Sequence, residues 1–327
     1  MQILVTGGAG FIGSNLAEGL LDQGHHVVVL DKLDPYYDLG IKEHNLNACR
    51  EAGRDRFEFV EGSTTDETLV EDVVATHDID VVFHEASKAG VRTSVEQPKA
   101  YNESNIDGIV SVLEAAADHG VERVINASSS SVYGVPEYLP YDEDHPNHPK
   151  SPYAVTKLAA EHYCNVYDDL RDVPTVNLRY FTVYGPRMRP NMAISNFVSR
   201  CLNDEPPIIY GDGEQTRDFT FINDVVRANL TLLETDAADG ETINIGSNDN
   251  ISIRELAEYA VDETGADVDI VHDDAKDADA RHTHADVSKA EELIDYEPST
   301  DIREGVSKFI DWYEANREWY EPLVRNS

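Results

Sequence analysis

The chain has 327 residues, enough for a sizeable hydrophobic core, and its length suggests two domains. Acidic side chains number 63 against 26 Lys and Arg, giving a net charge of −37. Such a charge argues against coating nucleic acid and against binding anionic membrane surfaces. No apolar stretch reaches the ~20 residues that span a bilayer, and we expect no signal peptide. The three cysteines are far apart, so we expect no disulfide framework and a reducing, cytoplasmic location.

The acidic side chains are spread along the whole chain and are not gathered in a tail. Distributed acidity is typical of proteins from salt-loving organisms, in which concentrated counterions screen the self-repulsion. We therefore expect a halophilic protein. The alternative is an ordinary acidic cytosolic protein, but the net charge is far larger than a solvated surface requires.

The first 180 residues alternate strand and helix signals in chain order. Continuous apolar runs predict buried strands, and the segment 14–23 reads as a helix that ends at Gly24. The predicted strands are 3–6, 27–30, 57–60, 81–84, 124–127 and 175–179. Buried strands separated by helices predict an α/β fold with a doubly wound parallel sheet of the Rossmann type.

From about residue 186 this pattern loosens, and Pro-rich pieces alternate with short helices and strands. We predict a Rossmann domain over residues 1–180 and a smaller mixed α/β substrate domain over residues 181–327. No clean linker separates them. The apolar segment 242–246 is expected to return to the first domain, so the two domains are partly interleaved.

A glycine-rich turn with Gly7, Gly10 and Gly13 follows the first predicted strand and precedes the first helix. Glycines at this spacing allow a tight turn, close approach of a pyrophosphate and packing of the helix on the strand. The pyrophosphate then sits on the helix N-terminus. Asp31 at the end of the second strand favours NAD over NADP, although the neighbouring Lys32 weakens that preference. A purely structural turn is the alternative.

A second candidate feature is the Tyr-x-x-x-Lys pair of Tyr153 and Lys157. Ser151 and Pro152 predict the start of a helix, on which these two side chains share one face. A tyrosine that acts as a base near neutral pH must lose roughly 3 pKa units, and one nearby cation supplies about that much. Packing of the tyrosine with a surface lysine is the alternative. The serine-rich run 128–131 follows a strand, where hydroxyls face the ligand crevice.

Together these pieces resemble the extended short-chain dehydrogenase/reductase family, and within it the NAD-dependent nucleotide-sugar epimerases and dehydratases. The resemblance covers essentially the whole chain and is strongest to UDP-glucose and UDP-glucuronate 4-epimerases. The matching segments are 6–13, 83–87, 128–134, 151–153, 177–181, 184–186, 217–219 and 283–286.

The resemblance implies that Tyr153 is the catalytic base, that Lys157 holds the cofactor ribose and lowers the tyrosine pKa, and that Ser129 bonds the reacting hydroxyl. It implies 4-epimerisation through a transient 4-keto sugar, with NAD regenerated in each turnover. The implied cofactor contacts are Gly7, Gly10, Phe11, Ile12, Gly13, Asp31, Ser63, Ala86, Lys88, Asn105, Tyr153, Lys157 and Tyr180. The implied substrate contacts are Ser129, Ser130, Thr182, Arg189, Tyr210, Arg217, Lys276 and Asp279.

Several positions depart from the family pattern. The dehydratases carry an Asp-Glu pair after the catalytic hydroxyl, whereas this chain has Ser130 and Ser131, which disfavours dehydration. Ser63 replaces the usual Asp near the adenine. Lys276 replaces an Arg on the nucleotide diphosphate and loses its bidentate fork, so Arg217 is expected to carry the diphosphate.

The sugar stays open at this point. The segments 34–38, 89–92 and 181–193 resemble the glucuronate branch, in which Arg189 would pair with a sugar carboxylate, but a solvated loop arginine is the alternative. UDP-glucose/galactose 4-epimerases share most other features. A related dehydratase or reductase, a net dehydrogenase and a non-enzymatic NAD-binding module are the competing functions.

Two expectations concern partners and metals. The predicted helices 106–116 and 155–166 carry apolar residues on more than one face, and the resemblance suggests that they pair in a homodimer. No histidine lies at a recognisable zinc spacing, so we expect no metal.

Overall fold

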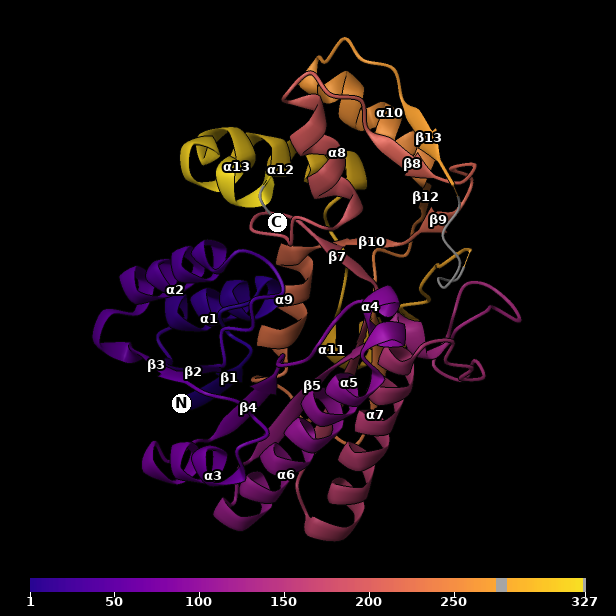
Figure 1. Cartoon of the computed structure of the whole chain (residues 1–327). Helices are drawn as coiled ribbons and strands as arrows, with labels where there is room; N and C mark the ends of the chain where they lie inside the picture. The colour runs from indigo at the N-terminus through magenta and orange to yellow at the C-terminus, as the bar shows by residue number, and fades with distance from the viewer. Residues whose placement is uncertain (275–280, 326–327) are drawn as a thin grey trace.

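The computed structural model describes residues 1–274 and 281–325. A sheet of seven parallel strands occupies the centre of the larger part of the molecule, in the order β11-β6-β5-β4-β1-β2-β3 (Figure 1). The strands are β1 Gln2–Thr6, β2 His26–Asp31, β3 Phe57–Glu61, β4 Val81–His84, β5 Arg123–Ser129, β6 Thr175–Tyr180 and β11 Thr242–Ile245. The order reverses between β1 and β4, and parallel sheets bind ligands beyond the carboxyl ends of such strands.

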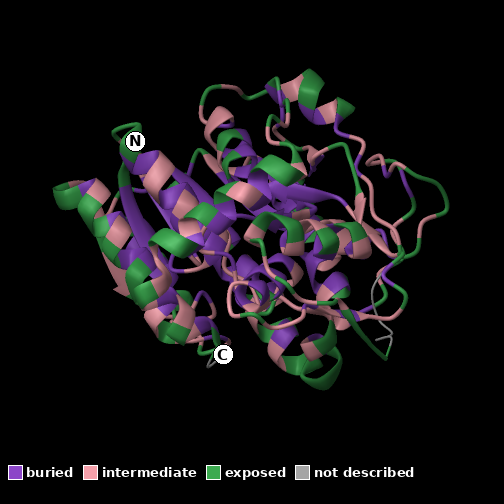
Figure 2. Ribbon diagram, turned by 90° about the horizontal axis from the view of Figure 1, so that it is seen from above, coloured by how far each residue is buried: buried purple, intermediate pink, exposed green. Residues whose placement is uncertain are grey.

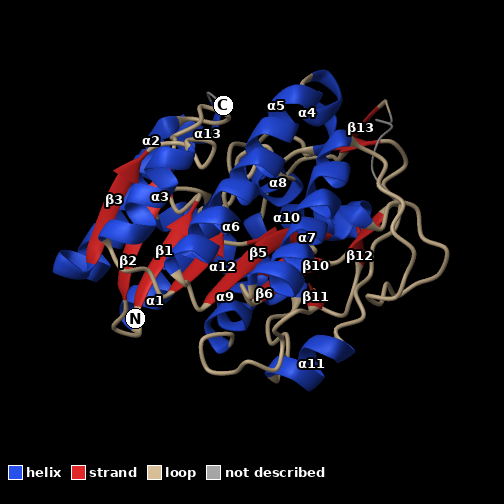
Figure 3. Ribbon diagram, turned by 90° about the horizontal axis from the view of Figure 1, so that it is seen from below, coloured by secondary structure: helices blue, strands red, loops and turns tan. Residues whose placement is uncertain are grey.

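Helices cover both faces of this sheet (Figure 3). One face packs against α1 Phe11–Asp22, α2 Leu39–Gly53 and α9 Ile222–Thr231, and the other against α3 Glu67–Thr76, α6 Gly108–His119 and α7 Pro152–Arg171. Along β1 the side chains alternate between the two cores, with Ile3 and Val5 in one and Leu4 in the other. The buried strands therefore lie between two layers whose outer helix faces are exposed (Figure 2).

Short helical elements lie in the connections between these strands and helices. They are η1 Arg54–Arg56, α4 Val91–Glu96, α5 Pro98–Asn102, the π-helical η2 Glu103–Asp107 and η3 Ser130–Val132. The predicted helix 106–116 therefore starts as a π-helical turn, and the predicted helix 14–23 begins earlier, at Phe11.

In its described residues, the second part of the chain forms three two-stranded sheets and, besides α9, five helices (Figure 1). Its strands are β7 Thr182–Tyr184 with β10 Phe219–Phe221, β8 Ile208–Tyr210 with β13 Val271–Asp273, and β9 Thr216–Arg217 with β12 Ile251–Ser252. Its helices are α8 Ala193–Cys201, α10 Ile253–Thr264, α11 Ser288–Ile294, α12 Ile302–Ala315 and α13 Arg317–Arg325.

The predicted α/β fold with a doubly wound parallel sheet is confirmed. The strand β11 pairs with β6, so the segment 242–246 does return to the main sheet. The boundary near residue 180 stays a prediction. Within residues 1–274 and 281–325, no helix combines the length and the apolar character needed to cross a membrane.

Candidate active site

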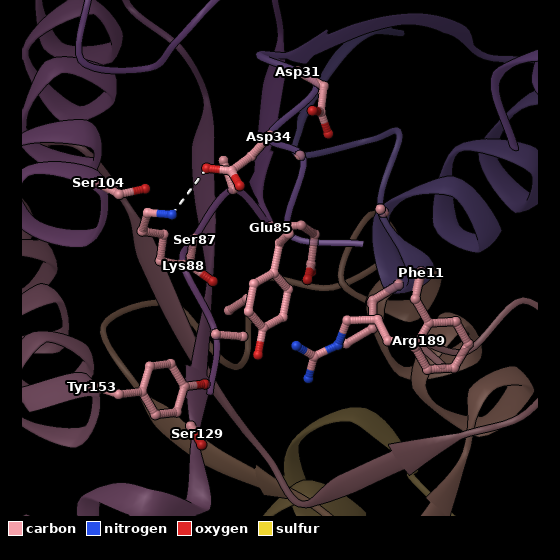
Figure 4. A pocket seen from close by; sticks show the side chains of 18 of the residues that line it. Phe11, Asp31, Asp34, Glu85, Ser87, Lys88, Ser104, Ser129, Tyr153 and Arg189 are labelled. Atoms are coloured by element: carbon pink, nitrogen blue, oxygen red, sulfur yellow. Dashed lines mark hydrogen bonds and ion pairs between the residues drawn. The ribbon is translucent and has the colours of Figure 1, made fainter. Parts of the chain in front are cut away.

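A cavity of about 610 Å³ opens at the carboxyl edge of the central sheet. The glycine-rich turn and β2 form one end of it, and the start of α7 with the end of β5 forms the other (Figure 4). Segments after β6 close it from the side of the second part of the chain. An elongated space between a helix N-terminus and a set of hydroxyls is suited to a dinucleotide and a second, polar ligand.

The glycine-rich turn is packed too tightly for side chains at two positions. Gly7 has φ +70°, and a Cβ there would lie 2.7 Å from the backbone of Ala86. A Cβ on Gly13 would lie 2.5 Å from the carbonyl oxygen of Gly7. The turn brings Gly10, Phe11 and the first turn of α1 to the cavity wall, where backbone N–H groups and the helix dipole attract anions. These residues fit the pyrophosphate of a dinucleotide.

The carboxylate of Asp31 marks the end of β2 in the same cavity. It accepts hydrogen bonds from the backbone N–H of Ala9 at 3.2 Å and of Leu33 at 2.8 Å. Lys42 from α2 lies 3.2 Å from it, and both side chains are buried. Lys42 was not among the predicted contacts, although it lines the cavity and balances the charge of Asp31.

A second ion pair lines the cavity next to the first. Asp34 accepts from Lys88 at 3.0 Å and lies 3.4 Å from Lys32 (Figure 4). Lys32 therefore turns toward Asp34, while Lys42 takes the place beside Asp31. Asn105 does not line the cavity: its side-chain oxygen accepts from the backbone N–H of Lys88 at 2.6 Å. Asn105 thus supports the Lys88 loop.

The predicted catalytic residues lie together at the opposite end. Ser151 caps α7 by accepting from the N–H of Ala154 at 3.2 Å, so Tyr153 stands in the first turn. Lys157 follows one turn later and donates to the carbonyl oxygen of Ala127 at 2.5 Å. Ser129, at the end of β5, points toward Tyr153 (Figure 4). All three line the cavity.

The pKa of Tyr153 lies above the ordinary value in the protein alone. Burial raises it most, the hydrogen bond with Ser129 and the charge of Arg189 lower it, and the charge of Glu85 raises it. The predicted lowering of the tyrosine pKa by Lys157 stays a prediction for the site with cofactor bound.

Glu85 is a further cavity residue that the sequence analysis did not assign. It directly follows β4, and its carboxylate accepts from the phenol of Tyr180 at 2.9 Å. Burial raises the pKa of Glu85 to about 7, although the hydrogen bond from Tyr180 and the charge of Lys157 lower it. Burial lowers the pKa of Lys157, and the charge of Glu85 raises it.

Most of the predicted cofactor contacts line the cavity, whereas only some of the predicted substrate contacts do. The former are Gly7, Gly10, Phe11, Ile12, Gly13, Asp31, Ser63, Ala86, Lys88, Tyr153, Lys157 and Tyr180. Among the latter, Ser129, Thr182 and Arg189 line it, and the Arg189 guanidinium projects into it (Figure 4).

Three predicted substrate contacts lie outside this cavity. Ser130 opens the short helix η3. Tyr210 stacks under Arg92, whose guanidinium carbon is 5.7 Å from the ring centre. Arg217 donates to the carbonyl oxygens of Thr216 and Arg281 and lines a separate hollow. The positions Lys276 and Asp279 lie outside the described residues.

A buried ion pair supports the catalytic end from behind. Arg179 on β6 makes two hydrogen bonds, of 2.9 and 2.8 Å, to Glu161 on α7, and Ser128 also donates to Glu161. The pair fixes α7 against β5 and β6, which carry the reacting groups. Within the described residues, no cluster of three or more His, Cys, Asp or Glu could hold a metal ion.

Residues 4–309 match the GDP-mannose 4,6 dehydratase family, and the chain belongs to that family. It is 38% identical to a UDP-glucuronate 4-epimerase of Thermodesulfobacterium geofontis, over 96% of this chain and 97% of that protein. The structure of UDP-glucuronic acid 4-epimerase from Bacillus cereus, in complex with UDP-glucuronic acid and NAD, superposes with a TM-score of 0.90 and 38% identity, over 96% and 99% of the chains. UDP-glucose 4-epimerase from Thermotoga maritima, with UDP-glucose, also gives 0.90, at 33% identity over 97% and 100%.

Proposed function

We propose that the protein is an NAD-dependent isomerase that inverts C4 of a UDP-sugar through a transient 4-keto sugar. The observation that carries this proposal is the placement of Tyr153, Ser129 and Lys157 at one end of a cavity whose other end is a dinucleotide-binding turn. NAD binding there is supported by the cramped glycine turn and by Asp31. NAD supplies reversible acceptance of a hydride from C4.

The side chains of this protein supply the proton chemistry. The phenolate of Tyr153 accepts the proton of the sugar 4-hydroxyl and returns it after the keto sugar has turned over. Ser129 orients the same oxygen through its hydroxyl. Lys157 contributes a cation and, released from the Ala127 carbonyl, a hydrogen-bond donor for the cofactor ribose. Inversion needs no other acid or base, because each proton taken up is given back.

Dehydration is disfavoured by the same geometry. An enzyme that removes water needs a carboxylic acid and a base near the leaving hydroxyl, but Ser130 and Ser131 occupy the two positions after Ser129. The side chain of Ser130 does not line the cavity. Glu85 is a carboxylate in the cavity, but it is held by the hydrogen bond from Tyr180 and does not stand at either of the two positions after Ser129. Membership of a family named after a dehydratase therefore does not fix the reaction.

The place of Arg189 favours a UDP-hexuronate as the substrate. Its guanidinium projects into the cavity beside Tyr36, 5.7 Å from that ring centre, and within electrostatic reach of Tyr153. A guanidinium binds a carboxylate through two parallel hydrogen bonds, which a sugar CH2OH cannot match. UDP-glucuronate and UDP-galacturonate are thus the proposed pair, with UDP-glucose and UDP-galactose as the alternative.

The test is incubation of the protein with UDP-glucuronate or UDP-glucose, followed by chromatographic separation and mass measurement of the products. Epimerisation keeps the mass of the sugar nucleotide, dehydration lowers it by one water, and a net dehydrogenase accumulates reduced cofactor. Arg189→Met should raise KM for UDP-glucuronate at least about tenfold and leave KM for UDP-glucose nearly unchanged. Arg254→Met, which removes an exposed arginine paired with Glu214, is the matched control.

The proposed assembly is a homodimer. Val155, Tyr163, Val166 and Leu170 are between 40% and 75% exposed and follow one face of α7. A stripe of exposed apolar residues this long is unusual on a monomer and suits a second copy of the same helix. A cytoplasmic location stays an expectation, supported by three cysteines that are all free and buried.

A further inference from the structure

Glu85 stands at the wall of the cavity among the groups that handle the proton. Its backbone N–H donates to the backbone carbonyl oxygen of Thr6 at 3.2 Å, which fixes the residue at the end of β4. Its carboxylate then points into the space between the glycine turn and Tyr153 (Figure 4). No Lys or Arg nitrogen lies within 4.0 Å of it in residues 1–274 and 281–325, in contrast to Asp31 and Asp34.

The titratable groups that face Glu85 come from several elements. Tyr180 on β6 donates to it at 2.9 Å, and the same phenol is held by Asn229 on α9 at 2.8 Å. Lys157 and Tyr153 on α7 interact with its charge. His84, its neighbour on β4, is turned away and bonded to Thr6 at 2.9 Å. Above its raised pKa of about 7, Glu85 therefore carries a negative charge that acts on both the proposed base and its cation.

We infer that Glu85 is a positioning residue that holds the proton on Lys157 and sets the pH range in which the site works. This inference rests on the proposed epimerase function. An ionised Glu85 stabilises the ammonium of Lys157 and destabilises the phenolate of Tyr153. Loss of that charge should therefore lower the pKa of Lys157 and the pKa of Tyr153 together.

The charge of Glu85 has a role in keeping Lys157 protonated. Burial alone favours the neutral amine of Lys157, and an amine cannot act as a cation beside the tyrosine. The second carboxylate near the lysine, Glu161, is already paired with Arg179 through two hydrogen bonds. Glu85 has no Lys or Arg nitrogen within 4.0 Å in the described residues, so its charge can balance Lys157 across the cavity. The hydrogen bond from Tyr180 fixes where that charge lies.

The experiment compares Glu85→Gln with the wild-type protein across pH. Glutamine keeps the shape and can still accept from Tyr180, so mainly the charge is lost. The alkaline limb of the pH–kcat profile should move about one unit to lower pH. The tyrosinate absorbance of Tyr153, read as the difference from a chain that also carries Tyr153→Phe, should titrate at lower pH by a similar amount. A merely structural role would lower kcat without moving either.

Two further variants complete the test. Glu85→Asp keeps the charge, so the alkaline limb of its pH–kcat profile should match the wild type. An alkaline limb displaced as in Glu85→Gln would overturn the inference. This variant also carries the test should Glu85→Gln not fold. Glu143→Gln removes another carboxylate whose pKa burial raises, but one bonded to the Asn244 N–H outside the cavity, and should leave both titrations unmoved. The inference about Glu85 is also overturned if Glu85→Gln leaves both the alkaline limb of the pH–kcat profile and the Tyr153 titration where they are in the wild type. The tyrosinate titration needs no turnover, so it distinguishes failure of this inference from failure of the epimerase proposal.

Discussion

Tyr153 is the side chain on which the proposed reaction depends most directly. Tyr153→Phe removes the proton acceptor with almost no change of volume, so folding should be preserved. We expect kcat to fall about 10²- to 10⁴-fold, the range that one acid–base group contributes. Steady-state assays with the preferred UDP-sugar, together with thermal unfolding, check both parts. Near-native turnover in the Phe variant would remove Tyr153 from the mechanism.

The buried pair of Lys42 and Asp31 gives a prediction about stability. Lys42→Met leaves the Asp31 carboxylate without its cation in a buried place, so the free energy of unfolding should fall by about 3 kcal/mol. The double variant Asp31→Asn with Lys42→Met should recover part of that loss, because no unpaired charge remains. Denaturant titration of the two single variants, Lys42→Met and Asp31→Asn, and of the double variant measures this. A double variant as unstable as the sum of the single ones would mean that the pair does not interact.

The cavity residues also show where sequence reasoning stops. The glycine turn, Asp31 and the Tyr153–Lys157 pair were predictable because each is a local pattern tied to the start or end of one element. Lys42 could not be placed, since it reaches Asp31 only through the packing of α2. Glu85 lies in the matching segment 83–87, but its role could not be predicted because its partner Tyr180 is on a strand 95 residues away.

At the scale of elements, the central strands were predicted nearly to the residue because buried parallel strands are continuous apolar runs. The second part was less predictable. Its strands are only two or three residues long, so their pairing depends on contacts between distant segments. Arg217 and Tyr210 lie on these short strands, and neither lines the main cavity.

Helix α7 carries the prediction about assembly. Val166→Glu places a charge in the middle of the exposed apolar stripe, where the proposed dimer would bury it unpaired. We expect this variant to be monomeric in light scattering, under the high-salt conditions in which we expect the wild type to be dimeric. Asn165→Glu, on an exposed position next to the stripe, serves as the control for added charge. A monomeric wild-type protein would refute the dimer itself.

The charge of the whole molecule leads to a prediction about salt. At a net charge of −37, carboxylates repel one another over ~10 Å at about 0.1 M salt and over ~3 Å at about 1 M. The compact state should therefore gain stability as KCl rises, and an anionic sugar nucleotide should also approach more readily. Thermal unfolding and activity measured from about 0.1 M to multimolar KCl check this. A melting temperature that does not change across the range contradicts a halophilic protein and leaves the proposed enzyme class untouched.

The pairing of β11 with β6 has a consequence for how the chain is made. The sheet that begins at Gln2 receives its last strand only at Thr242–Ile245, from the later part of the chain. While the ribosome is still adding the intervening residues, β6 presents an open edge of unpaired N–H and C=O groups, which is a template for wrong partners. A nascent chain that stops near residue 180 should therefore aggregate or bind chaperones, whereas one that extends past residue 245 should become soluble and protease-resistant.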